Sequence, residues 1–435
     1  MSTKTHSFRL RLTTLTPVAI GDGRTISPLS DYILDKASQQ IYPIHHQKFE
    51  RALQKRTAQD GSMRVMNEYI SKVNQTQGVN KNNFLKEFIG SSLGISDFAA
   101  LCHPQRFATH GIDNATEATT CLKNARQPYI SGSTLKGAIK GALLYDWLMN
   151  DFMGKKQLKE IAKLAKRFAD KMIPLNDELE DLAEQMEVYL PQNEYRRVNQ
   201  QKRTIEQKCK RFKQEFGRET DKVLNIFLEK ITTRKRMDFS LLQIGDTQLF
   251  SESDLAYYAL ERLFLNDGKL VSIGDIKEAI PAGKTTAFRL NLIPELQNSS
   301  LQFLNRADIG LIFKKLNSFS IANARYDKEC LLVANDHIKN ETLYNALLDF
   351  YEQIINDYAQ SQQAAALRIG AGKSYFHNSI GLALWQADDK HKVFEDFRYI
   401  FYNELNYDNE LFPKTRTLVS QPYCPLGWVR LAKDE

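Results

Sequence analysis

The chain has 435 residues, of which 42% are hydrophobic and 26% charged, so it can fill folded cores and is not a low-complexity disordered protein. The sequence starts without a secretory signal and contains no run of about 18 apolar residues, so we expect a cytoplasmic protein that crosses no membrane. Its formal net charge of +7 favours a polyanionic partner such as nucleic acid.

The first element is a strand with a basic outer face. Phe8, Leu10 and Leu12 alternate with Arg9 and Arg11, which is typical of a half-buried strand. A turn-rich stretch follows, and then two short strands at 32–34 and 41–44. Amphipathic helical patterns fill much of the segment 47–90, with interruptions at Gly61 and at 74–83.

The clearest helix is predicted over residues 134–149, where Ser133 or Thr134 can cap its start. Apolar residues recur there at every fourth position, as expected of a helix with one buried face. Beyond it, residues 155–235 are rich in lysine and arginine with acidic residues interleaved. This composition predicts an inserted helical element, with breaks at Pro174 and Pro191.

The last third of the sequence mixes strand and helix patterns. Strands are predicted at 239–244, 288–292 and 428–431, a helix at 341–364, and a glycine loop at 370–372. Because these elements show no regular βαβ spacing, they predict an α+β fold with antiparallel sheets.

The cysteines do not form a recognisable site. Five are scattered along the chain, and none forms a CxxC pair. Cys102, His103, His110 and Cys121 match no common zinc-ligand spacing. We therefore expect free thiols, no metal and no other cofactor.

The segment 128–140 places a glycine and hydroxyl turn before a helix, where free backbone N–H groups and the helix dipole favour an anion. Lys136 and Lys140 share one face of that helix and can reach successive phosphates. Gly137 and Gly141 are poor helix formers, so something must approach the helix closely there. Either nucleic acid or tight packing on a sheet would explain them.

A second glycine loop lies at 367–374, flanked by Arg368 and Lys373. A nucleotide-binding P-loop needs glycine where this sequence has Leu367, so the loop is not a P-loop. Its Gly370 and Gly372 are compatible with a loop lying against a nucleic-acid backbone or with a simple tight turn. Nearer the C-terminus, Lys414 and Arg416 alternate with hydroxyl residues, and Trp428 is predicted to be a core residue.

These segments resemble those of a known family. Residues 132–140 resemble the signature helix of RAMP proteins, the RRM-like subunits of CRISPR complexes. Residues 16–21, 368–373 and 425–431 resemble one branch of that family, the fifth subunit of the Csm-type, type III-A effector complex. The matches run in order from the first strand to the last, whereas the 155–235 region carries no such resemblance.

The resemblance implies two ferredoxin-like (RRM-like) RAMP domains with antiparallel sheets, at 1–150 and 236–435, separated by a charged helical insertion at 151–235. It implies a non-catalytic subunit that caps the 3′ end of the crRNA and supports crRNA maturation in antiviral defence. Its partners would be the crRNA, a neighbouring RAMP backbone subunit, a small helical subunit and host ribonucleases. The residues expected to contact RNA are Arg24, Ser133, Lys136, Lys140, Arg368, Gly370, Gly372, Lys373, Lys414 and Arg416.

Three other functions remain open. His45 and His46 could act as general acid and base in a RAMP-fold endoribonuclease that processes CRISPR precursor RNA. The chain could instead be a backbone RAMP subunit of another type III complex, although we expect Asp31 in its first loop to be inactive. Finally, the mixed charges of 155–235 are compatible with a pure assembly protein.

Overall fold

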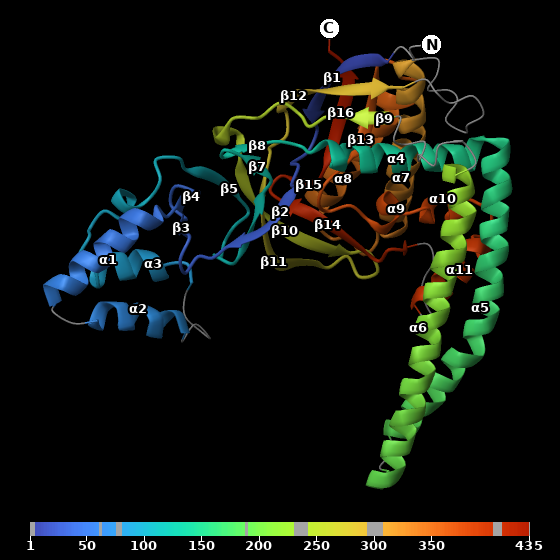
Figure 1. Ribbon diagram of the computed structural model, residues 1–435, viewed down its shortest axis with the longest axis horizontal. Coiled ribbons are helices and arrows are strands. Elements are labelled where there is room, and N and C mark those ends of the chain that lie inside the picture. The colour runs from blue at the N-terminus through green and yellow to red at the C-terminus, as the bar shows by residue number, and fades with distance from the viewer. Residues whose placement is uncertain are drawn as a thin grey trace.

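The computed structural model describes residues 5–60, 63–74, 81–187, 190–229, 242–293, 308–402 and 411–434. Two β-sheets form the body, helices pack against them, and a long helical pair projects to one side (Figure 1). This mixed architecture with sheets rich in antiparallel pairs confirms the predicted α+β class.

The first sheet has five antiparallel strands in the order β13-β16-β1-β12-β9. Their bounds are β1 (His6–Thr14), β9 (Leu242–Ile244), β12 (Thr285–Leu292), β13 (Ala364–Arg368) and β16 (Trp428–Lys433). Strand β1 lies at the centre, with Leu12 opposite Leu431 of the last strand. Leu10 and Leu12 are buried while Arg9 and Arg11 are exposed, so the predicted alternation is confirmed.

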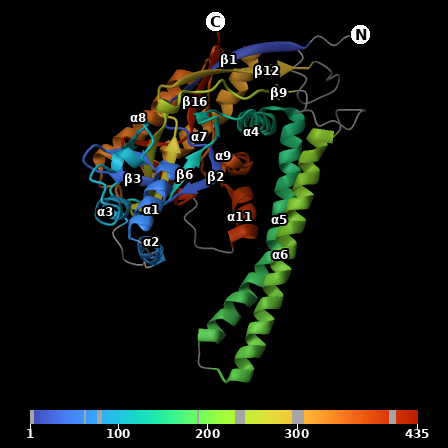
Figure 2. The same cartoon turned by 60° about the vertical axis from the view of Figure 1, so that its left-hand side comes forward.

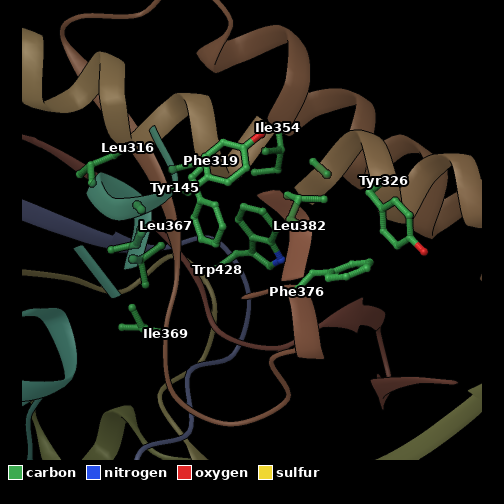
Figure 3. Close-up of a cluster of buried hydrophobic side chains, with 14 of the residues drawn as sticks. Tyr145, Leu316, Phe319, Tyr326, Ile354, Leu367, Ile369, Phe376, Leu382 and Trp428 are labelled. Atoms are coloured by element: carbon green, nitrogen blue, oxygen red, sulfur yellow. The ribbon is translucent and has the colours of Figure 1, made fainter. Parts of the chain in front are cut away.

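Three helices pack around this sheet: α4 (Gly132–Asn150), α7 (Ile309–Val333) and α8 (Glu341–Tyr358). Their apolar faces meet the sheet in a core where Trp428 is fully buried (Figure 3). Tyr145 of α4, Phe319 of α7 and Ile354 of α8 belong to the same cluster. Trp428 is therefore a core residue, as predicted.

The second sheet has the order β2-β6-β11-β10-β5-β4-β3, and β14 and β15 extend it from β10. The bounds are β2 (Gly21–Ile26), β3 (Tyr32–Asp35), β4 (Gln40–Pro43), β5 (Phe107–His110), β6 (Ala118–Cys121), β10 (Ala256–Phe264), β11 (Leu270–Ala279), β14 (Thr415–Ser420) and β15 (Tyr423–Pro425). Two of its strand pairs, β5–β10 and β6–β11, are parallel. Both sheets combine strands from the 1–150 and 236–435 segments.

A small helical lobe covers the β3–β4 end of the second sheet. It contains α1 (His46–Asp60), α2 (Arg64–Asn74), α3 (Phe84–Ser91) and the 3₁₀ turn η1 (Phe98–Leu101), in agreement with the helical pattern predicted for 47–90. Phe49, Phe84 and Phe88 form its separate core. Two minor elements, the hairpin β7 (Lys123–Asn124) with β8 (Gln127–Pro128) and the 3₁₀ turn η3 (Glu252–Asp254), lie elsewhere.

Two long helices, α5 (Phe152–Glu187) and α6 (Gln192–Glu229), form an antiparallel pair that we call the arm (Figures 1 and 2). Inward-facing residues of α5 recur at alternating steps of four and three, which is the heptad pattern of a coiled coil: Leu158, Ile161, Ala165, Phe168, Met172, Leu175, Leu179 and Leu182. The arm lies within the predicted 151–235 insertion.

The predicted break at Pro174 is wrong. Pro174 lies inside α5, which continues to Glu187, because packing against α6 on both sides of the proline outweighs its lost hydrogen bond. The cost is visible as a bend along the length of α5 (Figure 2). Pro191, in contrast, directly precedes α6.

Three short helices connect the body to the base of the arm: α9 (Tyr375–Asn378), α10 (Gly381–Trp385) and α11 (Lys392–Tyr402). Helix α11 packs along α5, and Phe216 of α6 contacts the rings of Phe168, Phe397 and Phe401. Aromatic packing thus fixes the arm to the body.

One sequence prediction near these elements was inaccurate, and a second falls partly on described residues. The helix predicted for 341–364 ends at Tyr358, and the alanine-rich segment that follows is the buried strand β13. The helix preference of alanine is weak, and pairing of this segment with β16 in the sheet outweighs it. Of the strand predicted at 239–244, the structure shows Leu242–Ile244, and residues 239–241 lie outside the described ranges.

The aromatic contact at the base of the arm gives a stability prediction. Phe216 is fully buried, so Phe216→Ala should lower the free energy of unfolding by about 3–5 kcal/mol in chemical denaturation. Phe152, which is 82% exposed at the start of α5, is the matched control, and Phe152→Ala should change it by less than about 0.5 kcal/mol. Equal losses of stability in the two variants would contradict the described packing.

Candidate nucleic-acid interface

Three of the segments singled out in the sequence meet in space. Backbone hydrogen bonds join them: Ala371 N–H donates to Ala19 O (2.9 Å), Ile369 N–H to Gly427 O (2.7 Å), and Gly427 N–H to Pro17 O (2.9 Å). We call residues 16–20, 369–372 and 425–428 the three-segment junction. It lies where the chain passes between the two sheets.

The glycines of this junction serve the packing of the chain itself. Gly370 and Gly427 have positive φ angles of 68° and 85°, which side-chain-bearing residues rarely adopt. A Cβ atom at Gly370 would collide with the carbonyl oxygen of Ala19, and one at Gly427 with that of Ile369. The sequence left two explanations for the 367–374 loop, contact with a nucleic-acid backbone or a simple tight turn. The tight turn accounts for these glycines.

A buried ionic cluster supports the loop from inside. Arg368 donates to Leu426 O (2.9 Å) and Gly372 O (2.8 Å), while Arg416 donates to a carboxylate oxygen of Asp327 at 2.8 Å. Arg368 is also within 3.9 Å of Asp327. Both arginines are at most 6% exposed, so their side chains hold backbone segments in place beneath the surface.

A cavity of about 180 Å³ opens beside this cluster. Both arginines, Lys373, Ser374 and hydroxyl residues of β14 line it. Burial and the repulsion from Arg368 lower the pKa of Lys373. Two guanidinium groups and one ammonium group line the cavity, and Asp327 is paired with the two arginines only, so the cavity can accept an anion such as a phosphate.

His377 adds a neutral polar group next to the cavity lining. It is buried, and this burial, followed by repulsion from Arg368, lowers its pKa well below the usual value. Its Nδ1 lies 2.7 Å from the hydroxyl of Ser374. The histidine therefore remains uncharged near neutral pH and positions Ser374.

The start of α4 differs from the prediction. Ser131, not Ser133 or Thr134, is the N-cap residue, and its hydroxyl accepts the Thr134 N–H. The N–H of Gly132 donates to the carboxylate of Asp246 at 2.7 Å. A carboxylate of the chain itself thus occupies the place where the sequence predicts an external anion.

The outer face of α4 is open. Ser133, Lys136, Gly137, Lys140 and Gly141 lie along it, and among the described residues nothing beyond the helix's own backbone comes within 4 Å of a Cβ placed at either glycine. Packing against the described residues therefore does not explain these two glycines. Partial burial and the neighbouring Lys140 lower the pKa of Lys136.

The side chains of the remaining predicted residues belong to neither place, although Lys414 lies between Pro413 and Thr415 of the cavity lining. Arg24 is exposed on β2, where its backbone N–H donates to Asp22. Lys414 is half-buried just before β14, outside the cavity lining. No residue of α4 lines the cavity, so Lys136 and Lys140 form a second basic surface on a helix that contacts α9.

The predicted histidines form a separate polar cluster. His46 Nε2 lies 3.3 Å from a carboxylate oxygen of Asp31, and the rings of His45 and His103 stack with their centroids 4.6 Å apart. Within the described ranges, no group of three or more His, Cys, Asp or Glu side chains is arranged to hold a metal ion.

Sequence reasoning missed Asp327 and Asp246. Asp327 follows Ser320 and Ala324 on the buried face of α7, so the helical period alone places a carboxylate in the core, where it needs a cation. That signal was available from spacing. Asp246 carries no comparable signal, because its role depends on a contact between segments 114 residues apart.

Known proteins resemble this chain in fold and not in sequence. No protein-family model matches the sequence, and no curated protein matches it. Among solved structures, Csm5 from T. onnurineus aligns with 96% of this chain and 99% of its own, with a TM-score of 0.59 and 18% identity. The chain has a Csm5-like fold.

A second solved structure extends the likeness. One chain of a Csm–crRNA–target RNA ternary complex from a type III-A CRISPR-Cas system aligns with 98% of this chain and 100% of its own, at 19% identity and a TM-score of 0.61. The Csm5-like fold therefore spans nearly the whole chain. Within the described ranges, none of its helices is both long and apolar enough to span a membrane.

The buried ionic cluster gives a second stability prediction. Asp327→Asn leaves two buried guanidinium groups without their counter-ion and should lower the free energy of unfolding by about 3–5 kcal/mol. Asp349→Asn, at an exposed position of α8, is the control and should be nearly neutral. Urea denaturation of both variants measures the difference. A neutral effect of Asp327→Asn would show that the arginines do not depend on this carboxylate.

Proposed function

We propose that the chain is the non-catalytic, crRNA-binding capping subunit of a type III-A (Csm-type) CRISPR interference complex. The observation that carries this proposal is the fold likeness, which covers 96–98% of this chain and 99–100% of the two neighbours. One neighbour was solved with crRNA and target RNA. The proposed partners are accordingly the crRNA, an adjacent RAMP backbone subunit and a small helical subunit.

The two basic surfaces supply a chemistry that fits a guide of any sequence. Lys136 and Lys140 on α4, and Lys373 at the cavity, can neutralise phosphates without reading bases. The open space beside Gly137 and Gly141 lets an RNA backbone approach α4 closely. Arg368 and Arg416 act in this proposal as internal supports of the cavity wall.

The direct test is purification of the tagged chain from its native host, followed by sequencing of bound RNA and identification of bound proteins. Repeat-derived guide RNA together with other Csm subunits is the expected result. A chain that purifies without guide RNA and without such subunits would overturn the proposal.

Replacement of the α4 lysines tests whether this helix binds RNA. Lys136→Ala with Lys140→Ala should weaken RNA binding, and the slope of log affinity against log salt should fall by about 0.7 for each phosphate of a single-stranded RNA that the variant no longer neutralises. Fluorescence anisotropy at several salt concentrations measures this. Lys36→Ala, in the exposed β3–β4 turn, is the control and should keep both affinity and slope. Unchanged binding in the double variant would remove α4 from the interface.

The histidine cluster supports one alternative function, that of an endoribonuclease. The pairing of His46 with Asp31 gives an imidazole oriented as in general acid–base sites, so an endoribonuclease acting on precursor RNA is a second candidate. We expect the purified chain to leave repeat RNA intact, and His46→Ala to leave guide RNA content unchanged. Cleavage of repeat RNA that disappears in His46→Ala would make the processing enzyme the better assignment.

A further inference from the structure

Helices α4 and α5 meet the α10–α11 segment at the base of the arm (Figure 1). The side chains of these elements enclose a groove. Its volume is about 350 Å³, and small-molecule sites in proteins commonly measure about 300–1,000 Å³. It is distinct from the cavity beside the three-segment junction, because the two share no lining residue.

The lining combines an apolar floor with a polar rim. Leu148, Met149 and Leu158 belong to the floor, together with Ala162, Ala387 and Val393. The rim carries Lys155, Lys159 and Gln386. The side-chain oxygen Oε1 of Gln386 accepts a hydrogen bond from the Tyr145 hydroxyl, so the side-chain NH₂ group is the part left to donate to a ligand.

Charge along α5 is divided between its two ends. Residues 155–171 contain seven lysines and arginines and only two acidic residues. Residues 177–187 contain six acidic residues and no basic one. The groove therefore lies at the positive end of α5, whereas the acidic half of α5 lies beside the basic first half of α6, where Arg197 and Lys208 are close to Glu178.

Lysines continue from the groove along the solvent side of α5. Lys155, Lys159 and Lys163 succeed one another every four residues, with a rise of about 6 Å per step, which is close to the spacing of phosphates along a nucleic-acid strand. Lys163 also pairs with Glu160, and Lys166 lies near Asp396, so Lys155 and Lys159 at the groove are the better candidates for a ligand.

We propose that this groove binds one nucleotide of a single-stranded RNA, with the base on the apolar floor and the flanking phosphates on Lys155 and Lys159. An apolar floor without a sequence-reading set of donors accepts different bases, as a guide of variable sequence requires. The proposal rests on the proposed crRNA-binding function and adds a second RNA-binding surface, away from the α4 lysines.

The test uses the full chain and a 4-thiouridine-containing single-stranded RNA as the probe. Lys155→Glu with Lys159→Glu should weaken binding at least about ten-fold, because two attractive phosphate interactions become repulsive. Ala162→Glu, which places a charged side chain on the floor, should also weaken it. Photo-crosslinks of the wild-type chain should map to peptides covering 148–162 or 386–393.

The matched control reverses the same number of charges elsewhere on the arm. Lys210 and Arg211 are exposed on α6 and do not line the groove. Lys210→Glu with Arg211→Glu should weaken binding less than about three-fold. Equal weakening in the two double variants would overturn the proposal, because net charge alone would then explain the effect. Circular dichroism confirms that each variant keeps its helices.

Three further outcomes separate this inference from the function on which it rests. If the groove variants bind RNA normally but lose a protein subunit on purification, the groove is a protein-docking site and the inference is wrong. If they bind RNA normally while the Lys136 and Lys140 variant does not, only the groove proposal fails. If the wild-type chain carries no guide RNA from its host, the proposed function fails first.

Discussion

The backbone contact among three remote segments is the constraint on which the rest of the structure depends. At the three-segment junction the chain leaves β1 for the second sheet, ends β13, and returns through β15 to β16. Each crossing would leave unpaired backbone groups in the interior. The junction satisfies them by pairing the crossings with one another, and Gly370 and Gly427 permit the close approach. The two sheets are therefore joined at a small, glycine-dependent site, beside the β11–β12 connection, where Val18 and Ile280 also pair.

Buried charge divides the basic residues into two classes. Arg368 and Arg416 are enclosed, share Asp327, and donate to backbone carbonyl groups, so they determine the position of the glycine loop. Lys136 and Lys373 are only partly buried, and their lowered pKa values reflect that partial enclosure. A polyanion would meet the lysines at the surface, whereas the arginines keep the cavity wall in place.

Predictions from the sequence were most accurate for elements in which the hydrophobic pattern of the sequence agrees with the packing in the fold. The alternation around Leu10 and Leu12, the helix near 134–149 and the burial of Trp428 are all present. Predictions were inaccurate where tertiary contacts overrule local preference: Pro174 stays helical inside the arm, and the alanines after Tyr358 join a sheet. The three motifs of the site were found in the sequence, but spacing could not separate the buried Arg368 from the accessible Lys373, because burial depends on partners from other segments.

The arm also has a mechanical consequence. At about 1.5 Å of rise per residue, the 36 residues of α5 span about 54 Å. Helices α4 and α11 hold α5 to the body, and α11 follows it at least as far as Asn176, which lies near Tyr399. About 16 Å of α5, from Asp177 to Glu187, therefore projects beyond these contacts. A tilt of this end by about 5° would move the tip by only about 1.5 Å, so a molecule that holds the tip would leave the groove, in the attached part of α5, little disturbed.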